Sequence, residues 1–133
     1  MDLKKSKNLS PRIKVIQKLY NALMNSDALI EYPKSQYKKF IKDIVTGTLE
    51  RYDLIEDKVK SLLANDINLA KTDKLLKIIL FAAIFELMFK HNIPKKVIIN
   101  EYLIASEHFL EKIQIGYLNA ILDKISKELR KDD

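Results

Sequence analysis

The stretch Leu75–Phe89, LLKIILFAAIFELMF, decides the fold of this chain. Only Lys77 and Glu86 carry charge in it, and apolar residues occupy every face of the helix that it would form. A helix that is apolar on all sides belongs in the centre of a folded domain. A membrane span is excluded by length, because these 15 residues fall short of the roughly 20 that a bilayer requires. We therefore predict a buried central helix with Thr72 or Asp73 as its N-cap.

Glu86 is the unusual residue of this predicted helix. Burying a carboxylate without a partner costs on the order of several kcal/mol, so the side chain must reach solvent, a basic group or another protein. Inside the chain, the Tyr20 hydroxyl or a lysine could serve as the partner. The sequence leaves the internal pair and the contact with another protein as open alternatives.

Amphipathic helices are predicted on both sides of the central segment. Apolar residues recur at three- and four-residue steps over residues 11–25, 40–63, 94–109 and 118–129. Ser10 and Pro11 suit the start of the first helix, and Gly47 is the expected bend in the second. Two glycines and three prolines leave few tight turns. We predict an all-α fold of about six to seven helices, forming one domain over residues 1–133 with a basic, flexible terminus at 1–9.

The positive charge of the chain is concentrated near its start. The net charge is +6, and residues 1–18 hold six lysine or arginine residues against one acidic residue. Along the first predicted helix, Lys14 and Lys18 share one polar face with Asn21 and Asn25. Of the 24 basic residues, 21 are lysines, whose compact charge suits phosphate groups better than base edges. The pattern favours a polyanionic partner, although a basic terminus can also serve solubility alone.

Catalytic and metal-binding patterns are missing from the sequence. There is no cysteine, and the two histidines, His91 and His108, do not stand at ligand spacing from acidic residues. Two glycines cannot build a phosphate-binding loop. Glu107 and Glu111 share a helical face, where a solvated surface is the simpler reading. We expect a binding protein with no enzymatic activity, no metal and no cofactor, and an intracellular, cytoplasmic location.

Two stretches of the chain resemble the NusB family of bacterial transcription antitermination factors. The first, PRIKVIQKLY at Pro11–Tyr20, is similar to the basic first helix of that family. The second runs over residues 75–124. It contains an apolar helix ending in Phe-Glu-Leu, an isoleucine-proline turn at 93–94, Ile-Asn-Glu at 99–101, and a closing segment from Tyr117 to Asp123. The resemblance covers nearly the whole chain.

The resemblance implies a function that composition and periodicity do not reveal. Members of the family have two small packed helical bundles and bind the boxA element of nascent single-stranded RNA. They do so together with a small-subunit ribosomal protein that doubles as the factor NusE. The complex joins RNA polymerase and helps it to read through terminators in ribosomal RNA operons. We expect the same partners and the same activity here.

The resemblance also assigns roles to particular residues. Tyr20 and Glu86 would face the ribosomal protein, and Phe109 and Tyr117 could stack on unpaired bases, although core packing is the alternative for both aromatic rings. The expected RNA contacts are Lys4, Lys5, Lys7, Arg12, Lys14, Gln17, Lys90, Phe109 and Tyr117.

Some features depart from the family pattern. Ala120 replaces a glycine of the closing motif, Ile113 stands where a polar residue is usual, and residues 25–34 are too few for a full second helix. Two other functions remain open. One is a helical RNA-binding domain like that of certain ribosomal RNA cytosine methyltransferases, which would need a longer chain with a catalytic cysteine. The other is a helical adaptor that binds only proteins.

Overall fold

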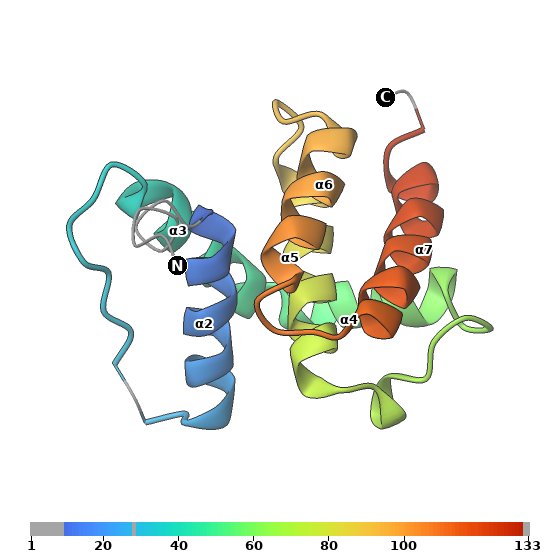
Figure 1. Ribbon diagram of the computed structural model, residues 1–133, viewed down its shortest axis with the longest axis horizontal. Coiled ribbons are helices and arrows are strands. Elements are labelled where there is room, and N and C mark those ends of the chain that lie inside the picture. The colour runs from blue at the N-terminus through green and yellow to red at the C-terminus, as the bar shows by residue number, and fades with distance from the viewer. Residues whose placement is uncertain (1–9, 28, 132–133) are drawn as a thin grey trace.

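The computed structural model describes residues 10–27 and 29–131, and that part of the chain is helical without any strand. The all-α prediction is confirmed. The flexible terminus predicted at 1–9, with Lys4, Lys5 and Lys7, lies outside the described residues. The elements in Figure 1 are α2 (Pro11–Met24), α3 (Lys38–Glu50), α4 (Tyr52–Leu62), the short 3-10 helix η1 (Leu69–Lys71), α5 (Lys74–Phe89), α6 (Lys95–Ser106) and α7 (Lys112–Leu129).

Helix α5 is the centre of the fold, as its sequence predicts. Eleven of its 16 residues are buried, and it packs against each of the other five α-helices. Helices α2 and α3 lie on one side of it and α7 on the other (Figure 1). The predicted cap is present, because the Asp73 side chain accepts a hydrogen bond of 3.1 Å from the Leu76 backbone N–H. The apolar stretch therefore joins the helices on its two sides, α2 and α3 on one and α7 on the other, in one core.

Helix α2 begins where Ser10 and Pro11 predict it. The Ser10 hydroxyl accepts a hydrogen bond of 3.1 Å from the Arg12 backbone N–H, and proline occupies the first helical position. Ile13, Val15, Ile16 and Leu19 are buried, and α2 packs against α3, α5 and α6. The opposite face of α2 carries exposed polar residues. The helix therefore presents a fixed polar surface to solvent.

The predicted bend at Gly47 is wrong. The helix over the second segment breaks at Arg51, between α3 and α4, and Gly47 lies inside regular α3. Gly47 has a packing role instead, because a Cβ atom built there would lie 2.1 Å from Cζ of Phe85. The absence of a side chain thus allows the ring of Phe85 to lie against the α3 backbone.

The connections agree with the predicted breaks. The described residues between α2 and α3 form no helix, and α6 and α7 are separated by a turn at residues 107–111. Glu111 and Gln114 form a reciprocal capping box at the start of α7. Among the residues that the structure describes, none of the helices has the length and apolar character needed to cross a bilayer.

Candidate functional site

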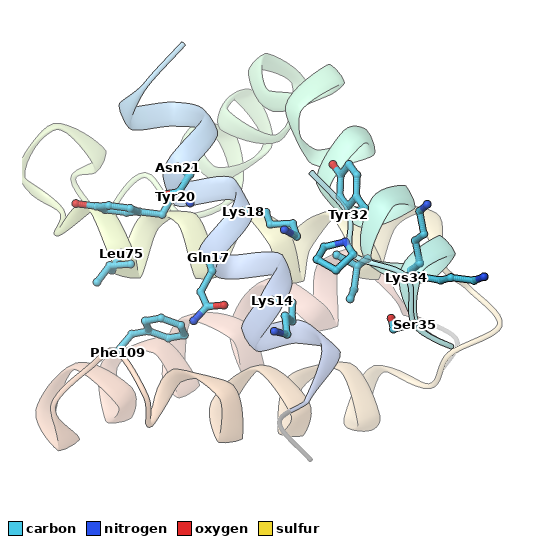
Figure 2. Close-up of a pocket in the computed structure, with 13 residues that line it drawn as sticks. Lys14, Gln17, Lys18, Tyr20, Asn21, Tyr32, Lys34, Ser35, Leu75 and Phe109 are labelled. Carbon is cyan, nitrogen blue, oxygen red and sulfur yellow. The ribbon is translucent and has the colours of Figure 1, made fainter. Parts of the chain in front are cut away.

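A groove of about 710 Å³ lies over the exposed face of α2. Helix α2 forms its floor, the segment that leads into α3 forms one side, and residues from the start of α5 and the α6–α7 turn form the other side (Figure 2). We call it the α2 groove. Its lining residues are Lys14, Gln17, Lys18, Tyr20, Asn21, Tyr32, Pro33, Lys34, Ser35, Lys38, Ile41, Leu75 and Phe109.

The α2 groove is strongly positive. Lys14 and Lys18 project from α2, and Lys34 and Lys38 come from the segment before α3 and from its first residue. Among the described residues, no aspartate or glutamate belongs to the lining. Within the described ranges, no carboxylate lies within 4.0 Å of any of these four ammonium groups, although other lysines of the chain do form such pairs. A site with four unneutralised cations attracts anions.

Aromatic and amide side chains accompany the lysines. Phe109 and Leu75 flank α2 beside Gln17 and Tyr20, on the side opposite Tyr32 (Figure 2). Phe109 is half-buried against the core, while Tyr20 is 39% exposed. Rings of this kind can stack on unpaired bases, and amides can donate to and accept from base edges. The groove thus offers phosphate-binding and base-binding groups together.

A buried polar network lies beneath the groove at the start of α2. Arg12 is 7% exposed, and its Nε and Nη2 atoms donate to the two oxygens of Glu86 at 2.9 and 2.6 Å. The Tyr102 hydroxyl also donates to Glu86. Glu101 lies 3.8 Å from the Arg12 guanidinium and accepts from the Ser10 hydroxyl at 3.3 Å. The network ties the first turn of α2 to α5 and α6.

Burial and neighbouring charges shift the pKa values of Arg12 and Tyr102 in this network. Burial favours the neutral form of Arg12, but the hydrogen bond and the negative charge of Glu86 outweigh it, and the pKa of Arg12 is raised. Burial and the adjacent Glu86 carboxylate raise the pKa of Tyr102 well above its usual value near 10. Both residues therefore keep their protons throughout the physiological pH range.

The network corrects the roles expected for Arg12 and Glu86. Glu86 is fully buried, so its side chain has no surface to offer to a ribosomal protein. Its internal partners are Arg12 and Tyr102, and the Tyr20 or lysine partner considered from the sequence is wrong. The guanidinium of Arg12 points inward, so it does not present itself to a phosphate as the resemblance implied. Both residues fix α2 in place.

Lys14, Gln17, Phe109 and Tyr20 are brought together in the α2 groove, but Lys90 and Tyr117 are not part of it. Lys90 Nζ lies 4.0 Å from a carboxylate oxygen of Asp43 on α3. The Tyr117 ring is 41% exposed, and its hydroxyl donates to the backbone carbonyl of Asp66 at 2.8 Å. Among the expected RNA contacts in the described residues, the groove therefore gathers Lys14, Gln17 and Phe109, while Lys90 and Tyr117 lie elsewhere and Arg12 is buried.

Two of the family departures face solvent. Ala120 is exposed on α7, so its extra methyl group meets no helix contact that it must fit. Ile113 is 86% exposed. Neither departure disturbs the core.

Sequence reasoning missed part of the groove. No role is predicted from the sequence for Tyr32, Lys34, Ser35 and Lys38, although the segment YPKSQYKK at residues 32–39 interleaves aromatic and basic residues. That composition is typical of nucleic-acid contacts and could have indicated the site. Their position across from α2 depends on the path of the loop, which no local pattern specifies.

Comparisons with known proteins agree with this architecture. A family model described as the NusB family matches residues 5–127. The transcription antitermination protein NusB of Rickettsia bellii is 34% identical over 137 aligned positions, which cover 88% of each chain. The protein of the same name from Rhodopseudomonas palustris is 34% identical over 94 residues, or 71% of this chain. The chain spans about half, 54%, of the length of that relative.

A solved structure shares the fold. The structure of T. maritima NusB superimposes with a TM-score of 0.75 and covers 89% of this chain and 90% of its own, at 23% sequence identity. At that identity the likeness concerns the fold alone. The match of the family model over nearly the whole chain, with the Rickettsia relative aligned over 88% of both sequences, establishes the relationship. The chain belongs to the NusB family.

Proposed function

We propose that this chain is a transcription antitermination factor that binds boxA-type single-stranded RNA together with the small-subunit ribosomal protein NusE. The bound complex would join RNA polymerase and help it to read through terminators in ribosomal RNA operons. The observation that carries the proposal is the α2 groove, where four lysines that have no carboxylate partner among the described residues accompany aromatic and amide side chains. The curated relatives, which are named as antitermination proteins and not as enzymes, support the same reading.

The RNA contacts that we propose follow the geometry of the groove. Lys14 and Lys18 would neutralise phosphates, Gln17 would hydrogen bond to a base edge, and Phe109 would stack on an unpaired base. The terminal lysines Lys4, Lys5 and Lys7 would add phosphate contacts. Lys90 and Tyr117 would take part only where the strand extends beyond the groove.

Arg12 and Glu86 act as positioning residues in this proposal. Their ion pair fixes the first turn of α2 against α5, so the exposed lysines keep their direction. Tyr20 is the candidate contact for the protein partner, because its ring is 39% exposed at the end of the groove and Met24, one turn further along α2, is 42% exposed. Such an apolar patch beside a basic groove fits a protein that binds next to the RNA.

The salt dependence of RNA binding tests the RNA part of the proposal. Each phosphate neutralised on single-stranded RNA contributes about 0.7 to the slope of log affinity against log salt, so Lys14, Lys18 and the three terminal lysines together give a slope of about −3.5. Fluorescence anisotropy with a short boxA-type RNA would measure it, with a scrambled RNA of equal length as control. Deletion of residues 1–9 should weaken binding with little change in melting temperature. A salt-independent affinity would overturn the proposal.

The protein partner requires a separate measurement. Tyr20→Ser should weaken co-purification with the small-subunit ribosomal protein, and Tyr37→Ser, which changes another exposed tyrosine, is the matched control. Both substitutions remove a ring at the surface, so their effects on folding should be similarly small. Equal retention of the ribosomal protein by both variants would contradict the role of Tyr20.

A further inference from the structure

The α2 groove has a second wall that faces the basic side of α2. The groove side formed by Phe109 and Leu75 is its first wall. The opposite side consists of Tyr32, Pro33, Lys34, Ser35 and Lys38, and we call these residues the second wall. Figure 2 shows Tyr32, Lys34 and Ser35 on one side of α2, across from Phe109 and Leu75 on the other. Lys14 and Lys18 lie between the two sides. The exposed face of α2 is thus the floor of a channel and does not stand alone.

The second wall is held in place by its own packing. Tyr32 is half-buried against the core, and burial raises the pKa of its hydroxyl. The ammonium of Lys18 lies 5.5 Å from the centre of the Tyr32 ring, within the range of a cation–π contact. The Ser35 backbone carbonyl accepts from the Lys38 N–H at 3.2 Å, and the Ser35 hydroxyl accepts from the Tyr37 N–H at 3.2 Å. These contacts fix the turn that leads into α3.

The second wall is positive on two grounds. Lys34 and Lys38 are exposed, and no carboxylate of the described chain lies within 4.0 Å of either ammonium group. Helix α3 also begins within the wall, with no side-chain cap and no acidic residue in its first turn. The positive end of the helix dipole favours anions there, although the Lys38 N–H itself is bonded to the Ser35 carbonyl. Two lysines and a helix start thus face the two lysines of α2 across the groove.

Four positive charges in one groove repel each other. The regularly spaced phosphates of a nucleic-acid strand can neutralise them and so remove the repulsion. We propose that the second wall binds the phosphodiester backbone of the RNA strand, so that the strand runs between Lys34 and Lys38 on one side and Lys14 and Lys18 on the other. The inference rests on the proposed RNA-binding function and adds a contact surface to it. Phe109, at the far side of α2, would then receive a base that points away from the second wall.

Removing the charge of the second wall tests the inference. In the Lys34→Gln/Lys38→Gln variant the salt slope should fall by about 1.4, which corresponds to about 25-fold weaker binding of a boxA-type RNA at 0.1 M salt. The matched control is Lys60→Gln/Lys71→Gln, which removes the same charge from exposed positions outside the groove. Its slope should remain that of the unaltered protein, because diffuse attraction alone is screened over about 10 Å.

Cross-linking provides a readout that does not depend on charge. The chain has no cysteine, so Ser35→Cys introduces a single thiol in the second wall that can carry a photoactivated cross-linker. Ser61→Cys, at an exposed position on α4, is the matched control. We expect covalent RNA adducts from position 35 and none above background from position 61.

The outcomes separate this inference from the proposed function. If the unaltered protein binds RNA while the second-wall variant keeps the full salt slope and position 35 forms no adduct, the second wall is not a contact and the RNA function stands. If the unaltered protein binds no single-stranded RNA, both proposals fail. Circular dichroism of each variant establishes that it is folded, and the cysteine variants keep all four lysines.

Discussion

Arg12 is a buried residue that supports the proposed RNA-binding face of α2 from inside the molecule. Its guanidinium lies between the carboxylates of Glu86 and Glu101, and the rings of Phe40 and Tyr102 cover it at 5.0 and 5.5 Å. A buried ion pair adds little net stability, because desolvation offsets the attraction, but removing one partner costs about 3–5 kcal/mol. The pair therefore fixes the position of the first turn of α2 against α5. That position sets the direction in which the groove lysines point.

Tyr102→Phe should alter the response of the protein to alkaline pH. The folded state keeps the Tyr102 proton at pH values where the unfolded chain has lost it, since the folded pKa is raised well above 10. The free energy of unfolding therefore falls by up to about 1.4 kcal/mol per pH unit above pH 10 on account of this residue. The variant should lack that part of the decline, while losing about 1–2 kcal/mol at pH 7 with the hydrogen bond to Glu86.

Urea unfolding between pH 7 and pH 11 measures both effects. Tyr37→Phe is the control, because that tyrosine is exposed and lies outside the buried network. Parallel pH curves for the unaltered protein and Tyr102→Phe would show that the buried hydroxyl ionises equally in the folded and unfolded states.

Arg130 closes the carboxyl end of α5 from the end of α7. It is 4% exposed, and its guanidinium donates to the backbone carbonyls of Glu86, Leu87, Lys90 and Ile93 over 2.5–3.1 Å. The last carbonyls of a helix lack partners within the helix, and a planar guanidinium can satisfy several of them at once.

Replacing Arg130 should therefore destabilise the whole protein. Arg130→Met removes the donor from the Leu87 and Ile93 carbonyls, while those of Glu86 and Lys90 keep a backbone N–H partner, and it should lower the free energy of unfolding by about 2–4 kcal/mol. Arg130→Lys should recover only part of this, because one ammonium cannot reach the same set of oxygens. Chemical denaturation measures the change, with the exposed Lys131→Met as control. If Arg130→Met had the same denaturation midpoint as the control, Arg130 would not stabilise the carboxyl end of α5.

At the scale of the elements, the two glycines show that helix propensity alone does not predict how a residue affects the stability of its helix. Both lie inside α-helices, Gly47 in α3 and Gly116 in α7, where alanine is intrinsically favoured by about 1 kcal/mol. A Cβ at Gly116 meets no atom within 4 Å, whereas one at Gly47 overlaps the ring of Phe85. The same residue type is thus a weakness in one helix and a packing requirement in the other.

The two alanine substitutions should have opposite signs. Gly116→Ala should raise the free energy of unfolding by about 0.5–1 kcal/mol through propensity and chain entropy. Gly47→Ala should lower it by about 1–3 kcal/mol, because Phe85 is buried and can move aside only by disturbing the core. Thermal and urea unfolding of the pair measure this difference, and each variant serves as the control for the other. Stabilisation by both would show that the Phe85 ring yields without cost.

At the scale of the whole molecule, α5 makes the two halves one cooperative unit. Helices α2 and α3 on one side, α7 on the other, and α6, which contacts both α2 and α7, all pack against it, and the buried residues form one continuous core. A core of this kind unfolds as a unit, while loops with little burial open locally. The floor of the α2 groove is a helix that packs into this core, whereas most of its second wall belongs to the loop before α3.

Native-state hydrogen exchange should reproduce this hierarchy. We expect the amides of residues 78–84 in α5 to exchange only through global unfolding, and the buried stretches of α2 and α7 to share that free energy. The described loop residues 29–37 should exchange fastest among the internal segments, since most of them are exposed. Exchange of α2 and α3 at a distinctly lower free energy than α6 and α7 would indicate two independent halves.

The sequence by itself determined the helical fold class, the helix starts at Ser10 and Asp73 and the central position of α5, because these depend on local periodicity and on residues such as Ser10, Pro11 and Asp73. It also placed the positive charge on the exposed face of α2. Only the tertiary structure decided the partner of Glu86, since Arg12 lies 74 residues away in the chain and packing alone brings the two together. The second wall across from α2 and the carbonyls bound by Arg130 depend on long-range packing for the same reason.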